Sequence, residues 1–287
     1  IPASFGCLTR LTSLNVGVNS LWGAVPPALG SLIGLTMLRL SGNSFAETLP
    51  SSLGSLSQLI DLFLNANCFS GPIPNSFGAL TQLTYMAVNG NKLTGTIPAT
   101  VGSMTALTYL YLYSNSITGT IPDEIGWLSH LLSLDAGRNP LSGAIPSTVG
   151  SLSGLMELYL YDTSISGPIP AAVGCLTALI SLLLNDNGLT GSIPDSFGSL
   201  SQLGDLALDG NHLTGTIPSS FAAYTELFSL ALNGNELTGR LPALLGGVVE
   251  LQLSQNRFTG SLPSEWGAMA ALAILNVDSN QLTGTVP

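Results

Sequence analysis

Charged side chains are scarce in this 287-residue sequence: 8% of the residues are charged, whereas 45% are hydrophobic. Positive charge is the scarcest, with six Lys and Arg residues against sixteen Asp and Glu and a formal net charge of −10. No basic stripe is present that would neutralise phosphates, so nucleic acid and anionic membranes are disfavoured as partners. The high apolar content excludes a disordered chain, because disordered chains have too little apolar surface to bury.

Long apolar runs and targeting signals are also missing. No stretch of about 18 consecutive apolar residues occurs, so no membrane insertion is expected within this segment. The first residues lack the basic region, apolar stretch and cleavage site of a signal peptide. No Asn-x-Ser/Thr glycosylation sequon is present despite many asparagines, and this absence weighs against an extracellular location.

The residues that carry most catalytic chemistry are few. The two histidines, His130 and His212, stand in variable positions of different repeats, with no third ligand or nucleophile paired to either. Asp205 and Asp209 flank one expected strand, but they lack the dense oxygen spacing of a calcium loop. We therefore expect no enzyme activity, no catalytic residue, no metal site and no cofactor.

A 24-residue repeat dominates what is present. Proline recurs at this spacing from Pro2 to Pro242, after which one interval shortens to 21 residues. Asparagine follows the same spacing from Asn19 to Asn280, and Thr163 alone breaks that series. The sequence therefore predicts twelve coils of 24 residues, one of them shortened to 21.

The strand and the turn after it follow from this repeat. The segment Tyr109–Tyr113 alternates tyrosine with leucine, which predicts a short strand with leucines inward and tyrosines outward. Stacked strands of this kind form a parallel sheet. The asparagine after each strand is expected to be buried and to satisfy backbone groups at the turn. Thr163 supplies only part of that bonding, so a local irregularity is expected there.

Glycine and proline determine the rest of the coil. Gly95 and its equivalents lie where the chain bends, and the proline after each Ile97-like residue cannot donate to a ladder. The return segment Ala99–Met104 is too short for a long α-helix and is expected to form a 3₁₀ turn or a single helical turn. The shortened interval loses three positions between Gly247 and Glu250, about one 3₁₀ turn, so the strand phase is kept.

Three cysteines, Cys7, Cys68 and Cys175, are spread along the repeats. Cys7 and Cys175 share a repeat position seven coils apart, roughly 33 Å at strand spacing, whereas a disulfide needs Cα atoms within about 7 Å. Cys68 lies at a different point of its coil, two to three coils from Cys7. We therefore expect three unpaired small hydrophobic side chains.

The strings LTGTIPATVGSMTALTYLYL and LTGSIPDSFGSLSQLGDLAL carry the pattern L-x-x-L-x-L-x-x-N-x-L-x-G-x-I-P. The whole chain resembles plant-type leucine-rich repeats, which occur in receptor-like kinases, receptor-like proteins and wall-protein inhibitors. The resemblance implies an α/β solenoid, a right-handed superhelix with a parallel sheet on its concave face and 3₁₀ or irregular turns on its convex face. It also implies an extracellular or cell-surface recognition module.

A single domain is expected for residues 1–287, because a periodic chain builds one quasi-linear core. The paired-cysteine caps of such ectodomains are missing, and the chain starts inside a repeat at Ile1-Pro2 and stops in the same phase. We interpret the segment as uncapped at both ends and as part of a longer chain or assembly.

The outward columns of the strands vary along the chain and are the natural place for a ligand. The candidate ligand-binding residues are Phe63, Tyr85, Tyr109, Tyr111, Tyr113, Asp135, Arg138, Glu157, Tyr159, Tyr161 and Asp162. Tyrosine offers rigid amphipathic contact area, and a buried carboxylate selects a cationic or hydroxyl-rich partner. The pattern predicts a cleft with tyrosine walls and a carboxylate floor. Alternatively, the tyrosines stack across strands and simply stabilise the sheet.

These observations favour a receptor-like module that binds a peptide, protein or glycan on the strand face. One alternative is a structural protein that self-associates head to tail into filaments or a surface layer, because a contact that does not close generates a fibre. A weaker alternative is ice binding through threonine columns such as Thr94 and Thr96, which proline, alanine and arginine interrupt in other coils.

Overall fold

The computed structural model describes residues 1–243 and 247–286. Contacts within the chain divide it into two compact units, Ile1–Ser142 and Gly143–Pro287, and each is described by itself. The single domain expected from the repeat stays a prediction.

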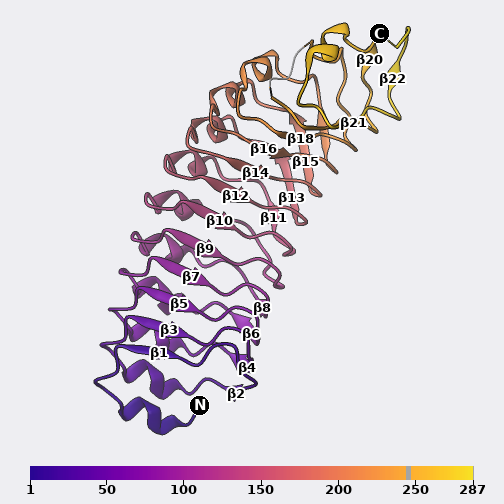
Figure 1. The fold of residues 1–287 in the computed structure, drawn as a ribbon. Helices are drawn as coiled ribbons and strands as arrows, with labels where there is room; N and C mark the ends of the chain where they lie inside the picture. The colour runs from indigo at the N-terminus through magenta and orange to yellow at the C-terminus, as the bar shows by residue number, and fades with distance from the viewer. Residues whose placement is uncertain (244–246, 287) are drawn as a thin grey trace. The chain divides into compact units, whose positions relative to one another are not determined.

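The first unit is built on parallel strands that follow one another in chain order (Figure 1). Residues 24 apart pair across neighbouring strands, as Leu38 does with Leu62. The alternation of leucine with other residues therefore aligns every leucine on the inner side and every variable residue on the outer side. The strands are β1 (Ser13–Asn15), β3 (Met37–Arg39), β5 (Asp61–Phe63), β7 (Tyr85–Ala87), β9 (Tyr109–Tyr111) and β10 (Ser133–Asp135).

The second unit repeats this arrangement. Its register also survives the shortened interval, because Leu230 pairs with Leu251, 21 residues later. The prediction that the loss of three residues keeps the strand phase is confirmed. The strands are β12 (Glu157–Tyr159), β14 (Ser181–Leu183), β16 (Asp205–Ala207), β18 (Ser229–Ala231), β19 (Glu250–Gln252) and β21 (Ile274–Asn276).

Among the described residues, short 3₁₀ turns carry the chain back between most successive strands, and they follow a proline, as η5 follows Pro98 in extended conformation. Among the described residues all helices are of this 3₁₀ type, which confirms the prediction made for Ala99–Met104. The turns are η1 (Ala3–Cys7), η2 (Pro27–Ser31), η3 (Ser51–Ser55), η4 (Asn75–Ala79), η5 (Ala99–Ser103), η6 (Asp123–Trp127), η7 (Ser147–Ser151), η8 (Ala171–Cys175), η9 (Asp195–Ser199), η10 (Ser219–Ala223) and η11 (Ser264–Ala268).

A second set of short strands lies between the asparagine and the proline of each coil. Those in the first unit are β2 (Trp22–Ala24), β4 (Ser44–Thr48), β6 (Cys68–Pro72) and β8 (Lys92–Thr94), and β11 (Ser142–Gly143) falls at the division between units. Those in the second unit are β13 (Ser164–Pro168), β15 (Gly188–Ser192), β17 (His212–Thr214), β20 (Thr259–Gly260) and β22 (Gln281–Leu282). Together, the parallel sheet and the short turns form the expected leucine-rich-repeat solenoid.

The repeated asparagines form a ladder of buried hydrogen bonds. The Nδ2 atom of Asn211 donates to the carbonyl oxygens of Leu184, Leu208 and Asp209 at 3.0–3.1 Å, and its Oδ1 accepts from the N–H of Leu189 at 3.0 Å. This side chain is 4% exposed. Asn211 thus satisfies backbone groups at its own turn, as the sequence predicted, and also links that turn to the preceding coil.

Thr163 is the one break in this ladder, and the expected irregularity is present. Its Oγ1 reaches the Leu160 carbonyl at 3.4 Å, accepts from the N–H of Ile165 at 3.2 Å and contacts Oδ1 of Asn187. In the complete coils, the N–H two residues after the ladder asparagine donates to the amide oxygen of the asparagine in the next coil, as the N–H of Leu189 donates to Oδ1 of Asn211. Here the N–H of Ile165 donates to Thr163 instead. A hydroxyl has fewer donors than an amide, so the bonding is rearranged.

Glycine is needed where the 3₁₀ turns of neighbouring coils approach each other. A Cβ atom on Gly54 would lie 2.4 Å from the carbonyl oxygen of Ser76, and the corresponding distance from Gly30 to Ser52 is 2.3 Å. Such distances are far below van der Waals contact, so any larger residue would force the coils apart. The glycine of the repeat therefore sets the spacing of the coils on this side.

Glu47 stands where eleven other coils place a bend glycine with positive φ, and it keeps a φ of 69°. A side chain in this left-handed region crowds its own backbone. Glu47→Gly is therefore expected to raise the free energy of unfolding by about 0.5–1 kcal/mol, even though glycine gains entropy in the unfolded chain. Urea denaturation measures the change. Glu47→Gln, which removes the charge but keeps the strain, is expected to show no gain, and an equal gain would refute strain as the cause.

Candidate functional site

The strand register of the first unit places the variable residues in columns on the outer side of the sheet. One column runs Asp61, Tyr85, Tyr109 and Ser133. The next runs Arg39, Phe63, Ala87, Tyr111 and Asp135. Because neighbouring strands lie about 4.8 Å apart, large side chains in these columns contact the coils beside them.

Four of the candidate residues form a continuous chain of aromatic contacts, here called the aromatic ladder: Phe63, Tyr85, Tyr109 and Tyr111. The centroid of the Tyr85 ring lies 4.7 Å from that of Phe63, 5.3 Å from that of Tyr109 and 5.5 Å from that of Tyr111. The Tyr85–Tyr111 pair meets edge to face at 71°, and the other two pairs are tilted. All four residues stay half-buried. The ladder is therefore held by its own contacts and still presents ring surface to solvent.

Arg39 extends the ladder at the β3 end. Its guanidinium carbon lies 4.2 Å from the centroid of the Phe63 ring, in cation–π geometry. Arg39 is not among the candidate residues predicted from the sequence. The signal was present, because Arg39 precedes Phe63 by one repeat in the same column.

The hydroxyl of Tyr85 stays protonated at neutral pH. Burial raises its pKa above the usual 10.0, the neighbouring Tyr111, Tyr113 and Tyr109 raise it further, and Arg39 lowers it. A protonated phenol both donates and accepts hydrogen bonds. The centre of the ladder therefore offers an apolar ring edge together with a neutral polar group.

Asp135, the expected carboxylate floor, follows the ladder on β10. It is 7% exposed, and its Oδ1 accepts the backbone N–H of Gly137 at 3.0 Å. Asn15 accepts the N–H of Gly17 at the same distance in the same repeat position. Asp135 thus has a turn-forming role that the sequence analysis did not foresee, in addition to its negative charge beside the ladder.

The remaining candidate residues flank the ladder or belong to the second unit. Tyr113 is half-buried after β9, and Arg138 is exposed with a φ of 52° after β10. In the second unit, Glu157 and Tyr159 lie on β12, and Tyr161 and Asp162 follow that strand. Glu157, Tyr159 and Tyr161 are half-buried, and Asp162 is exposed. Their part in one common cleft stays a prediction.

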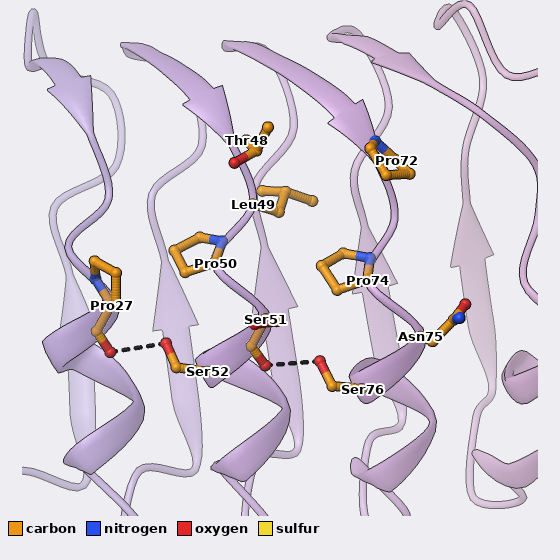
Figure 2. A pocket seen from close by; sticks show the side chains of 10 residues that line it. All are labelled: Pro27, Thr48, Leu49, Pro50, Ser51, Ser52, Pro72, Pro74, Asn75 and Ser76. Carbon is orange, nitrogen blue, oxygen red and sulfur yellow. Dashed lines mark hydrogen bonds between the residues drawn. The ribbon is translucent and has the colours of Figure 1, made fainter.

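A pocket of about 610 Å³ lies on another side of the first unit, beside η2, η3 and η4 (Figure 2). Its walls are made mostly of proline rings and serine side chains from three successive coils. The Oγ atoms of Ser52 and Ser76 donate to the carbonyl oxygens of Pro27 and Ser51 at 2.7 and 2.6 Å. The protons of these two hydroxyls are therefore already used by the backbone and are not available to a ligand.

His130 has its Nδ1 3.0 Å from the carbonyl oxygen of Thr105. Within residues 1–243 and 247–286, no group of three His, Cys, Asp or Glu side chains is placed to hold a metal ion. Over the same part of the chain, no helix has the length and apolar character needed to cross a membrane.

Carboxylates with raised pKa values lie on the strand face of the second unit. Burial raises the pKa of Asp205, the charge of Glu250 raises it further, and a hydrogen bond from Ser229 lowers it. Burial also raises the pKa of Asp209, to which Asp186 and Asp205 add, while a backbone hydrogen bond opposes them. The ionised forms of both groups are therefore less favourable in the folded chain than in the unfolded one.

This shift predicts a dependence of stability on pH. Because the folded pKa values of these two groups lie above the unfolded ones, their contribution to stability is most favourable below the ordinary pKa of Asp, near 3.9, and is lost as the pH rises through the folded values. The double variant Asp205→Asn, Asp209→Asn is expected to gain roughly 0.5 kcal/mol per site at about pH 7, after solvent screening. Urea denaturation at about pH 7 and about pH 3 measures this. The gain should vanish at the lower pH, and a gain of equal size at both would contradict the electrostatic cause.

Comparison with known proteins agrees with the repeat pattern. Family models described as leucine rich repeat match residues 33–93, 106–128, 178–200 and 247–269. No curated protein matched the sequence.

Solved structures of plant receptors match the fold over the full length of the chain. A crystal structure of a TDR receptor is 33% identical with a TM-score of 0.97, and the plant peptide hormone receptor RGFR1 in complex with RGF2 is 32% identical with a TM-score of 0.91. Both matches cover 100% of this chain and 50% of the receptor chain, so the chain spans about half the length of these receptors. A plant ice-binding protein is 25% identical, with a TM-score of 0.69 over 94% of this chain and 81% of its own.

The periodic leucines, the asparagine ladder, the matched repeat models and the agreement with plant receptor structures all point the same way: the chain is a leucine-rich-repeat protein with repeats of the plant type.

Proposed function

We propose that the chain is an extracellular, receptor-like recognition module that binds a peptide or protein segment on the outer side of strands β3 to β10. The observation that carries this proposal is the aromatic ladder, four half-buried rings in mutual contact on the outer side of the sheet. Rings that are already held in place lose little conformational freedom when a ligand covers them. Stacking across strands, the alternative reading of the tyrosines, supplies this rigidity and is compatible with binding.

The two ends of the ladder carry opposite charges, which suggests how a ligand lies. Arg39 is on β3 and Asp135 on β10, four strand spacings apart, roughly 19 Å. An extended peptide covers that distance with about six residues. We infer that the ligand crosses the strands, with an acidic group near Arg39, apolar side chains on the rings and a basic or hydroxyl group toward Asp135.

Solved relatives support a peptide as the ligand class. One is a peptide hormone receptor in complex with RGF2, and another is PEPR1 in a structure named PEPR1–AtPEP1, with 32% identity and a TM-score of 0.88. The ectodomain structures among the relatives support placement outside the cell. Glycan binding and head-to-tail self-association stay predictions.

Selection from a random peptide library displayed on phage tests this function. The wild-type chain is expected to enrich peptides with apolar residues between an acidic and a basic end. The same selection on a Tyr85→Ala, Tyr111→Ala variant should not enrich them. Enrichment of the same peptides on both proteins would contradict the proposed site, and the absence of any enriched peptide would count against peptide recognition.

Ice binding is a second candidate, which the similarity to a plant ice-binding protein favours. Hydroxyl side chains such as Thr190 and Thr214 recur, exposed, on the short strands of the second unit. Against a regular array, the Thr238 hydroxyl donates to the Gly215 carbonyl at 3.1 Å, and Arg240 interrupts the neighbouring column. Thermal hysteresis measured on the purified chain tests this candidate, and its absence would exclude it.

A further inference from the structure

Negative charge is concentrated in the second unit. Residues 143–287 hold eleven of the sixteen carboxylates and two of the six Lys and Arg residues, a formal charge of −9. Residues 1–142 hold the other five carboxylates and four cations, a formal charge of −1. The net charge of the chain is therefore almost entirely a property of its second unit.

Several of these carboxylates gather on the strand face, in an arrangement here called the acidic face: Asp186, Asp205, Asp209 and Glu250. Asp205 on β16 and Glu250 on β19 occupy one column, with Ser229 between them. The charges of Asp186 and Asp205 both act on Asp209. The two cations of this unit lie elsewhere. Arg257 forms an ion pair with Glu236 at 2.9 Å, and the backbone of Arg240 pairs with that of Thr259 in β20.

An apolar stripe runs alongside the acidic face, and each of its residues immediately precedes a strand. It consists of Met156, Ile180, Phe228 and Val249, which are 38%, 41%, 53% and 40% exposed. Backbone hydrogen bonds of 2.8–2.9 Å connect these positions from coil to coil, through Gly204 between Ile180 and Phe228. The Phe228 ring covers Gly204, since a Cβ there would lie 2.9 Å from its Cε1.

The same positions in the first unit show that this stripe is not a requirement of the repeat. Four of the six corresponding residues there are threonine, including Thr84 and Thr108. The first unit also lacks the excess of carboxylates. The first unit has one exposed apolar side chain at these positions, Ile60, which is 43% exposed. A stripe of several such side chains therefore coincides with uncompensated negative charge only in the second unit, and surface apolar stripes beside a polar rim are typical of interaction sites.

We propose that the acidic face and the apolar stripe together form a docking surface for a basic, amphipathic segment of a partner protein. Lysine or arginine side chains of the partner would face the carboxylates, and its apolar side chains would cover Ile180, Phe228 and Val249. The choice of partner rests on charge complementarity, because a one-signed face attracts the opposite sign and speeds encounter. This surface is separate from the aromatic ladder and goes beyond the proposed ligand site.

A designed peptide serves as the probe: a fluorescein-labelled Leu/Lys peptide of about 14 residues in amphipathic helical order. Fluorescence anisotropy with the full chain is expected to show saturable binding that weakens as NaCl rises from about 0.05 M to about 0.5 M. Binding should weaken about tenfold or more in each of two double variants. One is Asp205→Asn with Asp209→Asn, and the other is Ile180→Thr with Phe228→Thr. The threonines copy the first unit, and the Asn pair removes charge repulsion, so both variants are expected to fold.

The controls distinguish specific binding at the docking surface from unspecific attraction between opposite charges. Asp123→Asn with Glu124→Gln removes two carboxylates from η6 in the first unit and is expected to leave binding unchanged. A peptide of the same composition in shuffled order should bind at least about tenfold more weakly. Equal binding of the shuffled peptide, or no effect of either variant on the docking surface, would overturn the proposal. Neither outcome would bear on the aromatic ladder, whose ligand is measured with Tyr85 and Tyr111 variants.

Discussion

Replacement of Asn211 by alanine is expected to lower the free energy of unfolding by about 4 kcal/mol. The change removes four hydrogen bonds. The N–H of Leu189 loses its acceptor inside the core, and the carbonyl oxygens of Leu184 and Leu208 each keep one donor, from Asn187 and Asn235. A buried backbone group that loses its hydrogen bond costs about 1–3 kcal/mol. Urea denaturation followed by circular dichroism measures the loss.

Asn185→Ala is the matched control, because it removes an asparagine from the preceding coil, where Asn185 follows β14. The Nδ2 atom of Asn185 donates only to the carboxylate of Asp186, at 2.8 Å near the surface. Its replacement is expected to change the free energy of unfolding by less than about 0.5 kcal/mol. Equal losses in the two variants would show that the ladder bonds do not hold the coils together.

Tyr85→Ala combined with Tyr111→Ala is expected to weaken binding of a selected peptide about 100-fold, a loss of about 2.7 kcal/mol. The reason is that Tyr85 contacts three other rings, so its removal takes away both contact area and the support of its neighbours. Isothermal titration calorimetry on folded variants measures the change, with circular dichroism to verify the fold.

Two controls separate the rings from other effects. Tyr85→Phe with Tyr111→Phe keeps the rings and is expected to hold affinity within about threefold, less than the contribution of one hydrogen bond. Trp22→Ala removes an aromatic side chain that is 80% exposed on β2 and should leave affinity unchanged. A loss of similar size for Trp22→Ala, or none for the double alanine variant, would place the ligand elsewhere.

The sequence predicts the fold in detail because one coil is repeated twelve times. The leucine spacing determines which side chains face inward, and the proline and glycine positions determine where the 3₁₀ turns begin and how closely they approach. Even the defect at Thr163 follows from counting the hydrogen bonds that a hydroxyl lacks. Glu47 is different, because its positive φ is visible only by comparison with the glycines of the other coils.

The candidate site could be predicted only in part from the sequence. Column positions follow from the repeat, so the residues of the aromatic ladder were found. Which rings meet depends on rotamers and on small neighbours such as Ala87, and periodicity does not determine these. The cation–π contact of Arg39, the turn bond of Asp135 and the proline-lined pocket all depend on such local geometry.

Photo-cross-linking of a selected peptide is the most direct test of whether the aromatic ladder binds the ligand. The peptide carries a benzophenone at its apolar centre, and mass spectrometry identifies the residues of the chain to which it attaches. We expect adducts on residues of β5, β7 and β9, and we expect these adducts to be lost in the Tyr85→Ala, Tyr111→Ala variant. Adducts confined to the proline-lined pocket beside η3 and η4, or to the second unit, would contradict recognition by the aromatic ladder.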